Sequence, residues 1–467
     1  MMKKVIKIMF IIISFLSYGY LLFLLTDFGF LNNNVVLLVA FLLFTMLLVF
    51  SILIFRLKNK LIKIIICILV FLIIITSLLG TYYFKKTIYF IRKIKSNDEY
   101  NYYYVMVLNN NVYTKLSDIK NKDLGYINDE YDIVKEKFNI AVNDIKYDSL
   151  DSILEALYKK NIDAVLLSDS DTYILEENNE DFSYKTKVIY TIKIRRKVGK
   201  TVKKSAKEPF IIYISGIDTY GEISRVSRSD VNIIITVNPK DNKVLLTTIP
   251  RDYYVQLHGT TGIKDKLTHS GIYGVDMSIK TIEDLLDIDI DYYVRVNFST
   301  LVKLIDELGG VDVYSEKEFI PYTDKTLLIP SGMVHMDGRM ALAFARERYA
   351  YDEGDRHRGE NQEEIIKGLI EKIQSSPLII AKYSSILGVM EKDFETNIDD
   401  YFIKSMIKLQ MKNMPKWNVE VANLNGFDSK NYTYSGGDTI LYVMEPDYTV
   451  LNNVKNKIDS ILDSAKE

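Results

Sequence analysis

Three long apolar runs dominate the start of the chain. Residues 9–25, 35–55 and 64–84 form runs of 17, 21 and 21 residues, and none of them contains a charged side chain. About 20 helical residues, at about 1.5 Å each, cross a hydrocarbon core of roughly 30 Å. Buried helices of a soluble core would show a polar face, and a cleaved signal peptide would not be followed by two more such runs. Residues 1–90 are therefore predicted to be a three-helix transmembrane anchor.

Basic residues near these runs indicate how the anchor is oriented. By the positive-inside rule, cytoplasmic loops carry the excess of Lys and Arg. Basic residues lie before the first run and between the second and third runs: Lys3, Lys4, Lys7, Arg56, Lys58, Lys60 and Lys63. The rule therefore predicts a multi-pass protein of the cell membrane, with a cytoplasmic N-terminus and an extracellular C-terminal portion. The residues that oppose this orientation follow the third run: Lys85, Lys86, Arg92, Lys93 and Lys95.

Residues 97–195 are predicted to form a small α/β accessory domain. Residues 103–108, 164–167 and 187–194 have the composition of strands, and residues 150–159 have a helical pattern. The helix followed by the apolar strand at 164–167 indicates a βαβ-type unit, which resembles part of a periplasmic solute-binding fold. Residues 196–208 are basic and are predicted to be a linker to a domain spanning residues 209–462.

Composition excludes several classes of protein. The chain of 467 residues has 59 basic and 61 acidic side chains, whereas a nucleic-acid binder normally carries a basic excess, so no nucleic-acid partner is expected. Cys67 is the only cysteine and lies in the third apolar run. A disulfide framework or a cysteine-based metal site within the chain is therefore excluded.

Three predicted strands of the last domain bring charged residues to one sheet edge. Residues 210–215, 231–237 and 244–249 are apolar, and the second and third are joined by a turn at 238–242. A turn centred between Lys240 and Asp241 places Asp230 opposite Arg251. Asp218 reaches the same edge if the first strand runs parallel to the third. The alternative is a surface ion pair with an unrelated aspartate.

Cationic side chains gather further along the chain. Asp337 is a predicted N-cap of a helix ending near 345, and Arg346 and Arg348 follow it, on one face if that segment is extended. Arg358 and Gln362 are four residues apart in a helical pattern and share a face. Guanidinium groups bind phosphate oxygens, and several together suit a pyrophosphate. In the alternative, each arginine pairs with a carboxylate among Glu347, Asp352, Glu353, Asp355 and Glu360.

Six motifs in this order resemble the LytR–CpsA–Psr family, and the resemblance covers residues 210–373 with weaker agreement to 462. They are Gly216-Ile217-Asp218, Arg228-Ser229-Asp230, Ile249-Pro250-Arg251-Asp252, Asp265-Lys266-Leu267-Thr268-His269, the stretch from Asp337-Gly338 to Arg346-Glu347-Arg348, and Arg358-Gly359-Glu360-Asn361-Gln362.

The resemblance implies an α/β/α sandwich around a mixed, largely antiparallel sheet, with an apolar groove for a polyprenyl tail. It implies transfer of a glycopolymer, such as teichoic acid or capsular polysaccharide, from a polyprenyl-pyrophosphate carrier to a peptidoglycan hydroxyl, with Mg²⁺ or Mn²⁺ as cofactor. The metal would lie near Asp218 and Asp230, and the catalytic residues would be Asp230, Arg251, Arg346 and Arg348. The pyrophosphate would bind Arg251, Lys266, Arg346, Arg348, Arg358 and Gln362.

Two features depart from the family pattern, and two other functions compete with transfer. Many relatives have one membrane span and no unit like residues 97–195. A membrane-tethered sensor or transcriptional attenuator without turnover is one rival, although no DNA-reading helix is found among the cytoplasmic segments. The second rival is a pyrophosphatase, in which water replaces the sugar hydroxyl.

Overall fold

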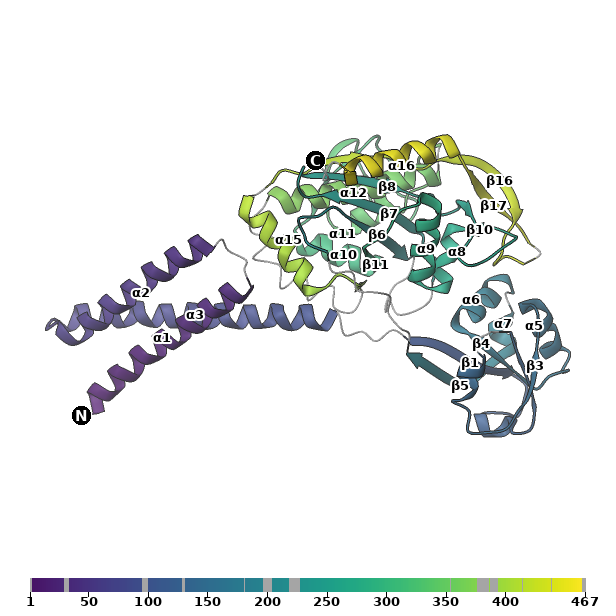
Figure 1. The fold of residues 1–467 in the computed structure, drawn as a ribbon, viewed down its shortest axis with the longest axis horizontal. Helices are drawn as coiled ribbons and strands as arrows, with labels where there is room; N and C mark the ends of the chain where they lie inside the picture. Colours follow the sequence, from purple (N-terminus) through teal and green to yellow (C-terminus); the bar gives the residue numbers. More distant parts are fainter. Residues whose placement is uncertain are drawn as a thin grey trace.

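The computed structural model has three parts along the chain: an anchor of three helices, a small α/β unit and a larger α/β unit (Figure 1). The residues that the structure describes are 2–28, 33–94, 100–127, 131–179, 181–195, 204–217, 227–352, 354–375, 386, 394–413, 415–437 and 439–463.

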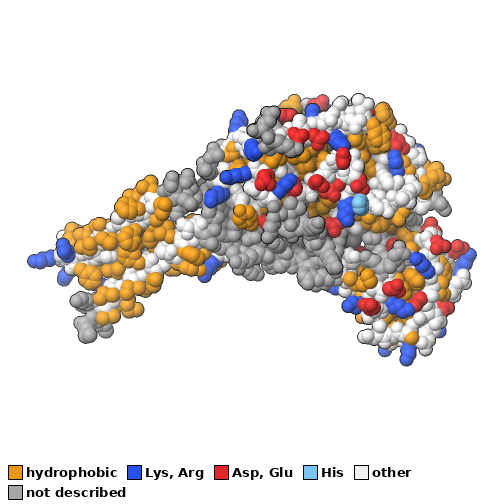
Figure 2. Space-filling model, viewed as in Figure 1, with side chains coloured by type: hydrophobic (Ala, Val, Ile, Leu, Met, Phe, Trp, Pro, Cys, Tyr) orange, Lys and Arg blue, Asp and Glu red, His pale blue; other side chains and the backbone are white. Residues whose placement is uncertain are grey.

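The anchor consists of α1 (Met2–Phe28), α2 (Asn33–Arg56) and α3 (Lys60–Ile94). Their segments Val5–Thr26, Leu37–Arg56 and Lys60–Tyr83 are long and apolar enough to cross a membrane. Many apolar side chains on these helices face outward, which suits lipid rather than water (Figure 2). All three predicted runs are helical, and α3 continues to Ile94, beyond the apolar run that ends at residue 84.

The small unit holds a five-stranded sheet of order β3-β2-β4-β1-β5. Strand β2 pairs in parallel with both β3 and β4, so α5 connects two parallel strands, as the βαβ pattern predicts. Apolar clusters pack on both faces of this sheet. The elements are β1 (Tyr100–Leu108), η1 (Leu116–Ile119), β2 (Asp123–Tyr126), α4 (Tyr131–Lys135), β3 (Asn143–Lys146), α5 (Leu150–Tyr158), β4 (Ala164–Ser168), α6 (Asp169–Asn178), α7 (Phe182–Lys185) and β5 (Thr186–Arg195).

The large unit is built on a six-stranded sheet of order β14-β11-β6-β7-β8-β15. The pairs β6–β7, β7–β8 and β11–β14 are antiparallel, whereas β11–β6 and β15–β8 are parallel. The sheet is therefore mixed and largely antiparallel, as expected. Its strands are β6 (Phe210–Ile217), β7 (Val231–Asn238), β8 (Lys243–Thr248), β11 (Tyr292–Asn297), β14 (Phe394–Thr396) and β15 (Asn418–Val421).

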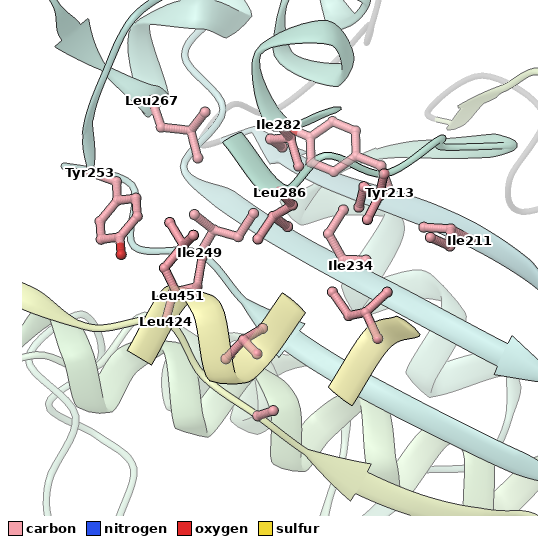
Figure 3. Close-up of a cluster of buried hydrophobic side chains, with 14 of the residues drawn as sticks. Ile211, Tyr213, Ile234, Ile249, Tyr253, Leu267, Ile282, Leu286, Leu424 and Leu451 are labelled. Carbon is pink, nitrogen blue, oxygen red and sulfur yellow. The ribbon is translucent and has the colours of Figure 1, made fainter. Parts of the chain in front are cut away.

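Helices cover both faces of this sheet, because residues along its strands point alternately to either side. Ile211 and Tyr213 of β6 pack with α9 (Val275–Leu286) and α16 (Tyr448–Asp463) in the core drawn in Figure 3. Phe210 of the same strand packs on the other face with α12 (Asp355–Ser375) and α15 (Asp400–Asn413). The architecture is the predicted α/β/α sandwich.

Shorter elements surround the sandwich. Three two-stranded pairs, β9–β10, β12–β13 and β16–β17, lie outside the main sheet. The remaining elements are β9 (Tyr254–Val255), β10 (Asp265–Lys266), α8 (Leu267–Ser270), η2 (Gly271–Tyr273), α10 (Phe298–Glu307), β12 (Val311–Ser315), β13 (Gly332–Met336), α11 (Gly338–Ala345), β16 (Gly426–Tyr432) and β17 (Ile440–Pro446).

Candidate active site

The hairpin of β7 and β8 brings Asp230 and Arg251 together. Its register pairs Ile233 with Thr248 and Asn238 with Lys243, so positions 230 and 251 fall opposite each other just beyond the strands. The Arg251 guanidinium forms an ion pair with the Asp230 carboxylate. Thr268 Oγ1 also donates to Asp230 Oδ1 at 3.3 Å. The pairing predicted from the turn centre is confirmed.

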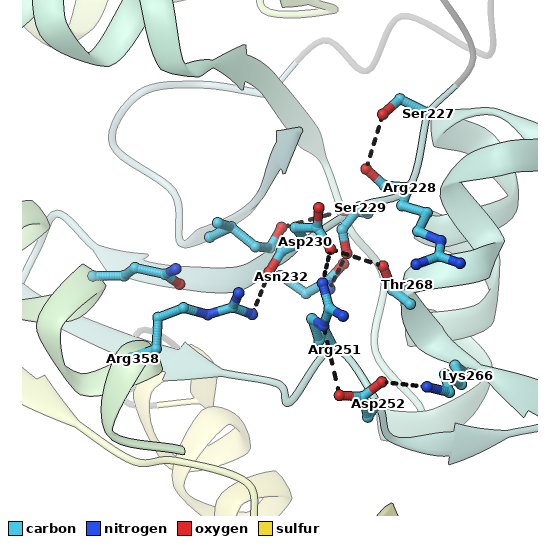
Figure 4. Close-up of polar contacts among 12 residues, drawn as sticks. Ser227, Arg228, Ser229, Asp230, Asn232, Arg251, Asp252, Lys266, Thr268 and Arg358 are labelled. Carbon is cyan, nitrogen blue, oxygen red and sulfur yellow. Dashed lines mark hydrogen bonds and ion pairs between the residues drawn. The ribbon is translucent and has the colours of Figure 1, made fainter. Parts of the chain in front are cut away.

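A chain of charges continues from this pair (Figure 4). Asp252 lies between Arg251 and Lys266: its Oδ2 is 3.5 Å from Arg251 Nε, and its Oδ1 accepts a hydrogen bond from Lys266 Nζ at 2.9 Å. Burial opposes ionisation of Asp252, but the charge of Arg251, together with the charge and hydrogen bond of Lys266, outweighs it and lowers the pKa of this carboxyl. Asp252 thereby holds both cations in place.

Helix α12 supplies Arg358 and Gln362 from one face. Arg358 Nη2 donates to the backbone carbonyl oxygen of Asp230 at 3.3 Å, and Gln362 Nε2 donates to the carbonyl oxygen of Ala345 at 3.3 Å. The spacing of four residues places both side chains on one face of α12, as predicted, with Arg358 beside the start of β7 and Gln362 beside the end of α11.

Helix α11 and the turn after it supply Arg346 and Arg348. Asp337 caps the helix by accepting from the Met340 N–H at 2.8 Å, which confirms the predicted start. The condition for a shared face, an extended segment, is not met at Arg346, which is helical at φ −100° and ψ −6°. The turn is shaped by the buried carboxylate of Glu347, whose oxygens accept hydrogen bonds from the N–H groups of residues 322, 348, 349 and 350. Glu347 therefore stabilises the backbone conformation of the turn.

These residues meet at one cavity of about 360 Å³. Among the residues that the structure describes, three arginines and one carboxylate line it, an excess of two positive charges. The Arg346 guanidinium also lies over the Phe298 ring, 4.4 Å from its centroid. The polar and charged residues named above that line the cavity are Asp230, Arg346, Arg348, Arg358 and Gln362.

Most of the remaining wall is apolar. It comes from the same face of the sheet as Phe210, and from α10, α11 and α12. Apolar residues of the wall include Ile214, Ile217, Val231, Ile233, Val294, Val296, Leu301, Leu304, Leu342, Ile365, Ile366, Leu369 and Phe394.

The predicted site residues differ in how they reach the cavity. Arg251 and Lys266 are linked to it through Asp230 and Asp252. Asp218 lies outside the described residues; β6, which precedes it, runs antiparallel to β7 and ends at Ile217, itself a cavity residue. Thr268 and Asp252 were not predicted as site residues, although both lie within motifs that carry the family resemblance.

The donor set at Asp230 is suitable for a divalent cation. Mg²⁺ prefers oxygen ligands and is commonly held by one or two carboxylates together with phosphate oxygens and water. Among the residues that the structure describes, no group of three His, Cys, Asp or Glu side chains could hold a metal alone. Asp230 fits such an ion only where substrate oxygens complete the coordination.

Comparison with known proteins finds relatives that share one named activity. The teichoic acid transferase TagU of Bacillus cereus (strain AH820), called polyisoprenyl-teichoic acid–peptidoglycan teichoic acid transferase, is 34% identical over 270 residues, 58% of this chain and 84% of that protein. TagV of Bacillus subtilis (strain 168), with the same activity in its name, is 34% identical over 265 residues, 55% of this chain and 66% of that protein. The crystal structure of B. subtilis TagV matches with 33% identity and a TM-score of 0.46, over 55% of this chain and 98% of that chain.

The model of the LytR_cpsA_psr family matches residues 173–457, from within α6 to within α16. This match covers more than half of the chain and includes every described residue of the site. The chain belongs to the LytR_cpsA_psr family.

Proposed function

We propose that this protein is a membrane-anchored phosphotransferase that moves a glycopolymer from a polyprenyl-pyrophosphate carrier onto a sugar hydroxyl of peptidoglycan. The observation that carries the proposal is the composition of the cavity, whose described residues combine a largely apolar wall with three arginines and one carboxylate. A lipid pyrophosphate has the same two parts, an apolar chain and a compact anion. The relatives named as teichoic acid transferases support this substrate class.

The electrostatic balance favours a doubly charged ligand. A pyrophosphate that links a lipid to a sugar carries about two negative charges, and the excess of Arg346, Arg348 and Arg358 over Asp230 among the described lining residues attracts such an anion. Guanidinium groups can bind phosphate oxygens in pairs, and each charge-assisted hydrogen bond is worth roughly 1.5–3 kcal/mol. The apolar wall would hold the adjoining part of the polyprenyl chain.

The reaction exchanges one phosphorus–oxygen bond for another. The acceptor hydroxyl attacks the phosphorus that carries the polymer, and the bond from this phosphorus to the bridging oxygen breaks. Polyprenyl phosphate leaves with the bond electrons, and the hydroxyl proton passes to solvent. Arg346, Arg348 and Arg358 stabilise the charge on the phosphoryl oxygens, so catalysis consists mainly of positioning and electrostatic stabilisation.

We propose Mg²⁺ or Mn²⁺ as the cofactor, held by Asp230, by Asp218 and by pyrophosphate oxygens. Such an ion would screen the negative charge of the pyrophosphate. Arg251 and Thr268 hold the Asp230 carboxylate in a fixed orientation. Lys266 and Arg251, which both form ion pairs with Asp252, add positive charge near this carboxylate.

We also propose that the N-terminus is cytoplasmic and that both α/β units are extracellular. The Lys and Arg residues before α1 and between α2 and α3 support this orientation. It would place the cavity on the side of the membrane where peptidoglycan lies, and the anchor would confine the enzyme to the plane of its lipid substrate.

The test uses the full chain in liposomes with a lipid-pyrophosphate-linked sugar donor, Mg²⁺ and soluble peptidoglycan oligomers, with products identified by mass spectrometry. We expect an adduct whose mass corresponds to a phosphodiester between the donor sugar and the oligomer. Release of sugar phosphate with or without oligomers, and no adduct, would identify a pyrophosphatase. Donor binding without any product would favour the sensor.

A further inference from the structure

The hairpin of β16 and β17 lies directly beside the charges of the active site. The Met444 N–H of β17 donates to the backbone carbonyl oxygen of Asp252 at 2.7 Å. The Lys266 ammonium lies 5.9 Å from the centroid of the Tyr442 ring. The hairpin is therefore continuous with the chain of charges that begins at Asp230.

One face of this hairpin presents aromatic and apolar side chains to solvent. In the register, Tyr432 pairs with Ile440 and Lys430 pairs with Tyr442, so these side chains share one face. The exposed fractions are 49% for Tyr432, 56% for Ile440 and 40% for Tyr442. Tyr254 of β9 adjoins the same hairpin, and its hydroxyl donates to the Tyr432 carbonyl oxygen at 2.8 Å.

Polar groups lie among these rings. The Tyr442 hydroxyl donates to Asp428 Oδ1 at 2.8 Å, and Arg356 Nη2 donates to the same oxygen at 3.0 Å. Asp428 remains largely exposed and Arg356 partly so. Flat rings beside exposed hydroxyl, carboxylate and guanidinium groups suit a sugar chain, whose pyranose rings have C–H faces and hydroxyl edges.

We propose that this face, formed by Tyr432, Ile440 and Tyr442 and called the hairpin platform below, binds the glycan strand of the acceptor. The inference rests on the proposed function and adds to it the place where the acceptor binds. It assigns Tyr432 and Tyr442 as residues that determine acceptor affinity.

The geometry of phosphoryl transfer selects the acceptor over the donor polymer. Attacking and leaving oxygens lie roughly in line on opposite sides of the phosphorus. The leaving group is the polyprenyl phosphate, whose chain would lie against the apolar wall of the cavity. The cavity's lining among the described residues comes from the main sheet, α10, α11, α12 and nearby loops, and none of it from β16 or β17. The hairpin platform is therefore separate from the cavity assigned to the lipid phosphate, yet it adjoins Asp252 and Lys266, as a site for the acceptor requires.

The test compares two substitutions on opposite faces of the hairpin in the full chain in liposomes. Tyr432→Ala removes a ring of the hairpin platform, and Phe427→Ala removes a ring of 63% exposure that points to the other face. We expect Tyr432→Ala to raise the KM for peptidoglycan oligomers roughly tenfold, the effect of losing one stacked ring, with the donor KM changed much less. Phe427→Ala should match the wild type, and Tyr432→Phe should restore the wild-type KM.

A binding measurement separates this inference from the proposed function. Peptide-free glycan oligomers, without donor, are titrated into the detergent-solubilised protein by calorimetry. Loss of binding in Tyr432→Ala but not in Phe427→Ala would support the hairpin platform even if no transfer product were found, a result that would count only against the transferase. Equal binding by both variants, or binding that requires the stem peptide, would overturn the hairpin platform as a glycan site.

Discussion

At the scale of single residues, the carboxylate of Glu347 fixes the turn that carries two arginines of the site. Glu347 is 1% exposed, and the N–H groups that it accepts from lie 2.6 to 3.1 Å from its oxygens. The sequence suggested Glu347 only as a partner for an arginine. Its contact with the N–H group of residue 322 depends on a loop that is distant in the sequence, so no local pattern could predict that part of its role.

Glu347→Gln should destabilise the protein and weaken the site. One oxygen of the carboxylate becomes an NH₂ group, which cannot accept the N–H groups that faced it, and each buried donor left unpaired costs about 1–3 kcal/mol. We expect a lower Tm and a higher KM for the lipid donor. Glu318→Gln, at an exposed position, removes the same charge and serves as the control. Equal Tm values for the two variants would contradict this role of Glu347.

The pair of Asp230 and Arg251 could be predicted because hairpin geometry alone determines it. Once the turn centre is known, every opposite pair in the strands follows. The contacts of Asp252 with Lys266 and of Asp230 with Thr268 could not be predicted in the same way. They depend on β9, β10 and α8 folding back over the sheet edge, which is a tertiary arrangement.

At the scale of elements, the close crossing of α10 and α11 shapes the cavity wall. A Cβ atom on Gly338 would lie 2.2 Å from the carbonyl oxygen of Val302 and 2.7 Å from its Cα. The Gly338 N–H also donates to Asp306 Oδ1 at 2.8 Å. The family motif contains this glycine, but only the packing of the two helices explains why no larger residue fits.

Gly338→Ala should therefore separate the two helices. Overpacking of this kind costs typically 1–3 kcal/mol, and α10 and α11 both line the cavity, so we expect a lower Tm together with weaker donor binding. Gly19→Ala in α1 is the matched control, since its added Cβ would have no atom within 4 Å. Thermal unfolding of the two variants in detergent checks the prediction, and an unchanged Tm for Gly338→Ala would refute it.

Helix α12 carries Glu363, a buried carboxyl group whose protonation links the stability of the protein to pH. Glu363 Oε2 accepts a hydrogen bond from Asn423 Nδ2 at 2.9 Å, and burial raises the pKa of Glu363 to about 7. The folded protein therefore binds this proton more tightly than the unfolded chain does. Its stabilising contribution is complete below the unfolded pKa of 4.5 and declines as the pH rises through 7.

Glu363→Gln, which imitates the protonated carboxyl, should remove this dependence. We expect the variant and the wild type to have similar stability near pH 4.5. At pH 8 the variant should be more stable by on the order of 3 kcal/mol. Unfolding of both proteins across this pH range provides the measurement, with Glu364→Gln on the same helix as the control. A constant difference between wild type and Glu363→Gln at all pH values would rule out the raised pKa.

At the scale of the whole molecule, the order of anchor, small unit and large unit could be predicted from hydrophobic pattern alone. Long apolar runs, alternating strands and helical periods are local signals. The contact between the units could not be predicted. Ser170 Oγ of α6 donates to the carbonyl oxygen of Ile272 at 2.6 Å, next to the segment that carries Lys266 and Thr268. The resemblance of the small unit to a solute-binding fold stays a prediction.

The proposed orientation can be tested with single cysteines in a Cys67→Ser background. Val112→Cys lies in the small unit at a position of 85% exposure, and Lys58→Cys lies between α2 and α3. A membrane-impermeant maleimide applied to intact protoplasts should label Val112→Cys, because the small unit is proposed to be extracellular. Lys58→Cys should be labelled only after permeabilisation. The opposite labelling would reverse the proposed orientation.

The most direct test of the central claim is the yield of phosphodiester adduct from Arg346→Ala in liposomes with donor, Mg²⁺ and peptidoglycan oligomers. Arg339→Ala on α11 is the control, because Arg339 is exposed and pairs with Asp324, and neither residue lines the cavity. The proposed pyrophosphate site predicts that Arg346→Ala loses roughly 10²–10³-fold in rate, as for removal of a transition-state donor, while Arg339→Ala keeps the wild-type rate. A folded Arg346→Ala protein that forms adduct at the wild-type rate would contradict the account.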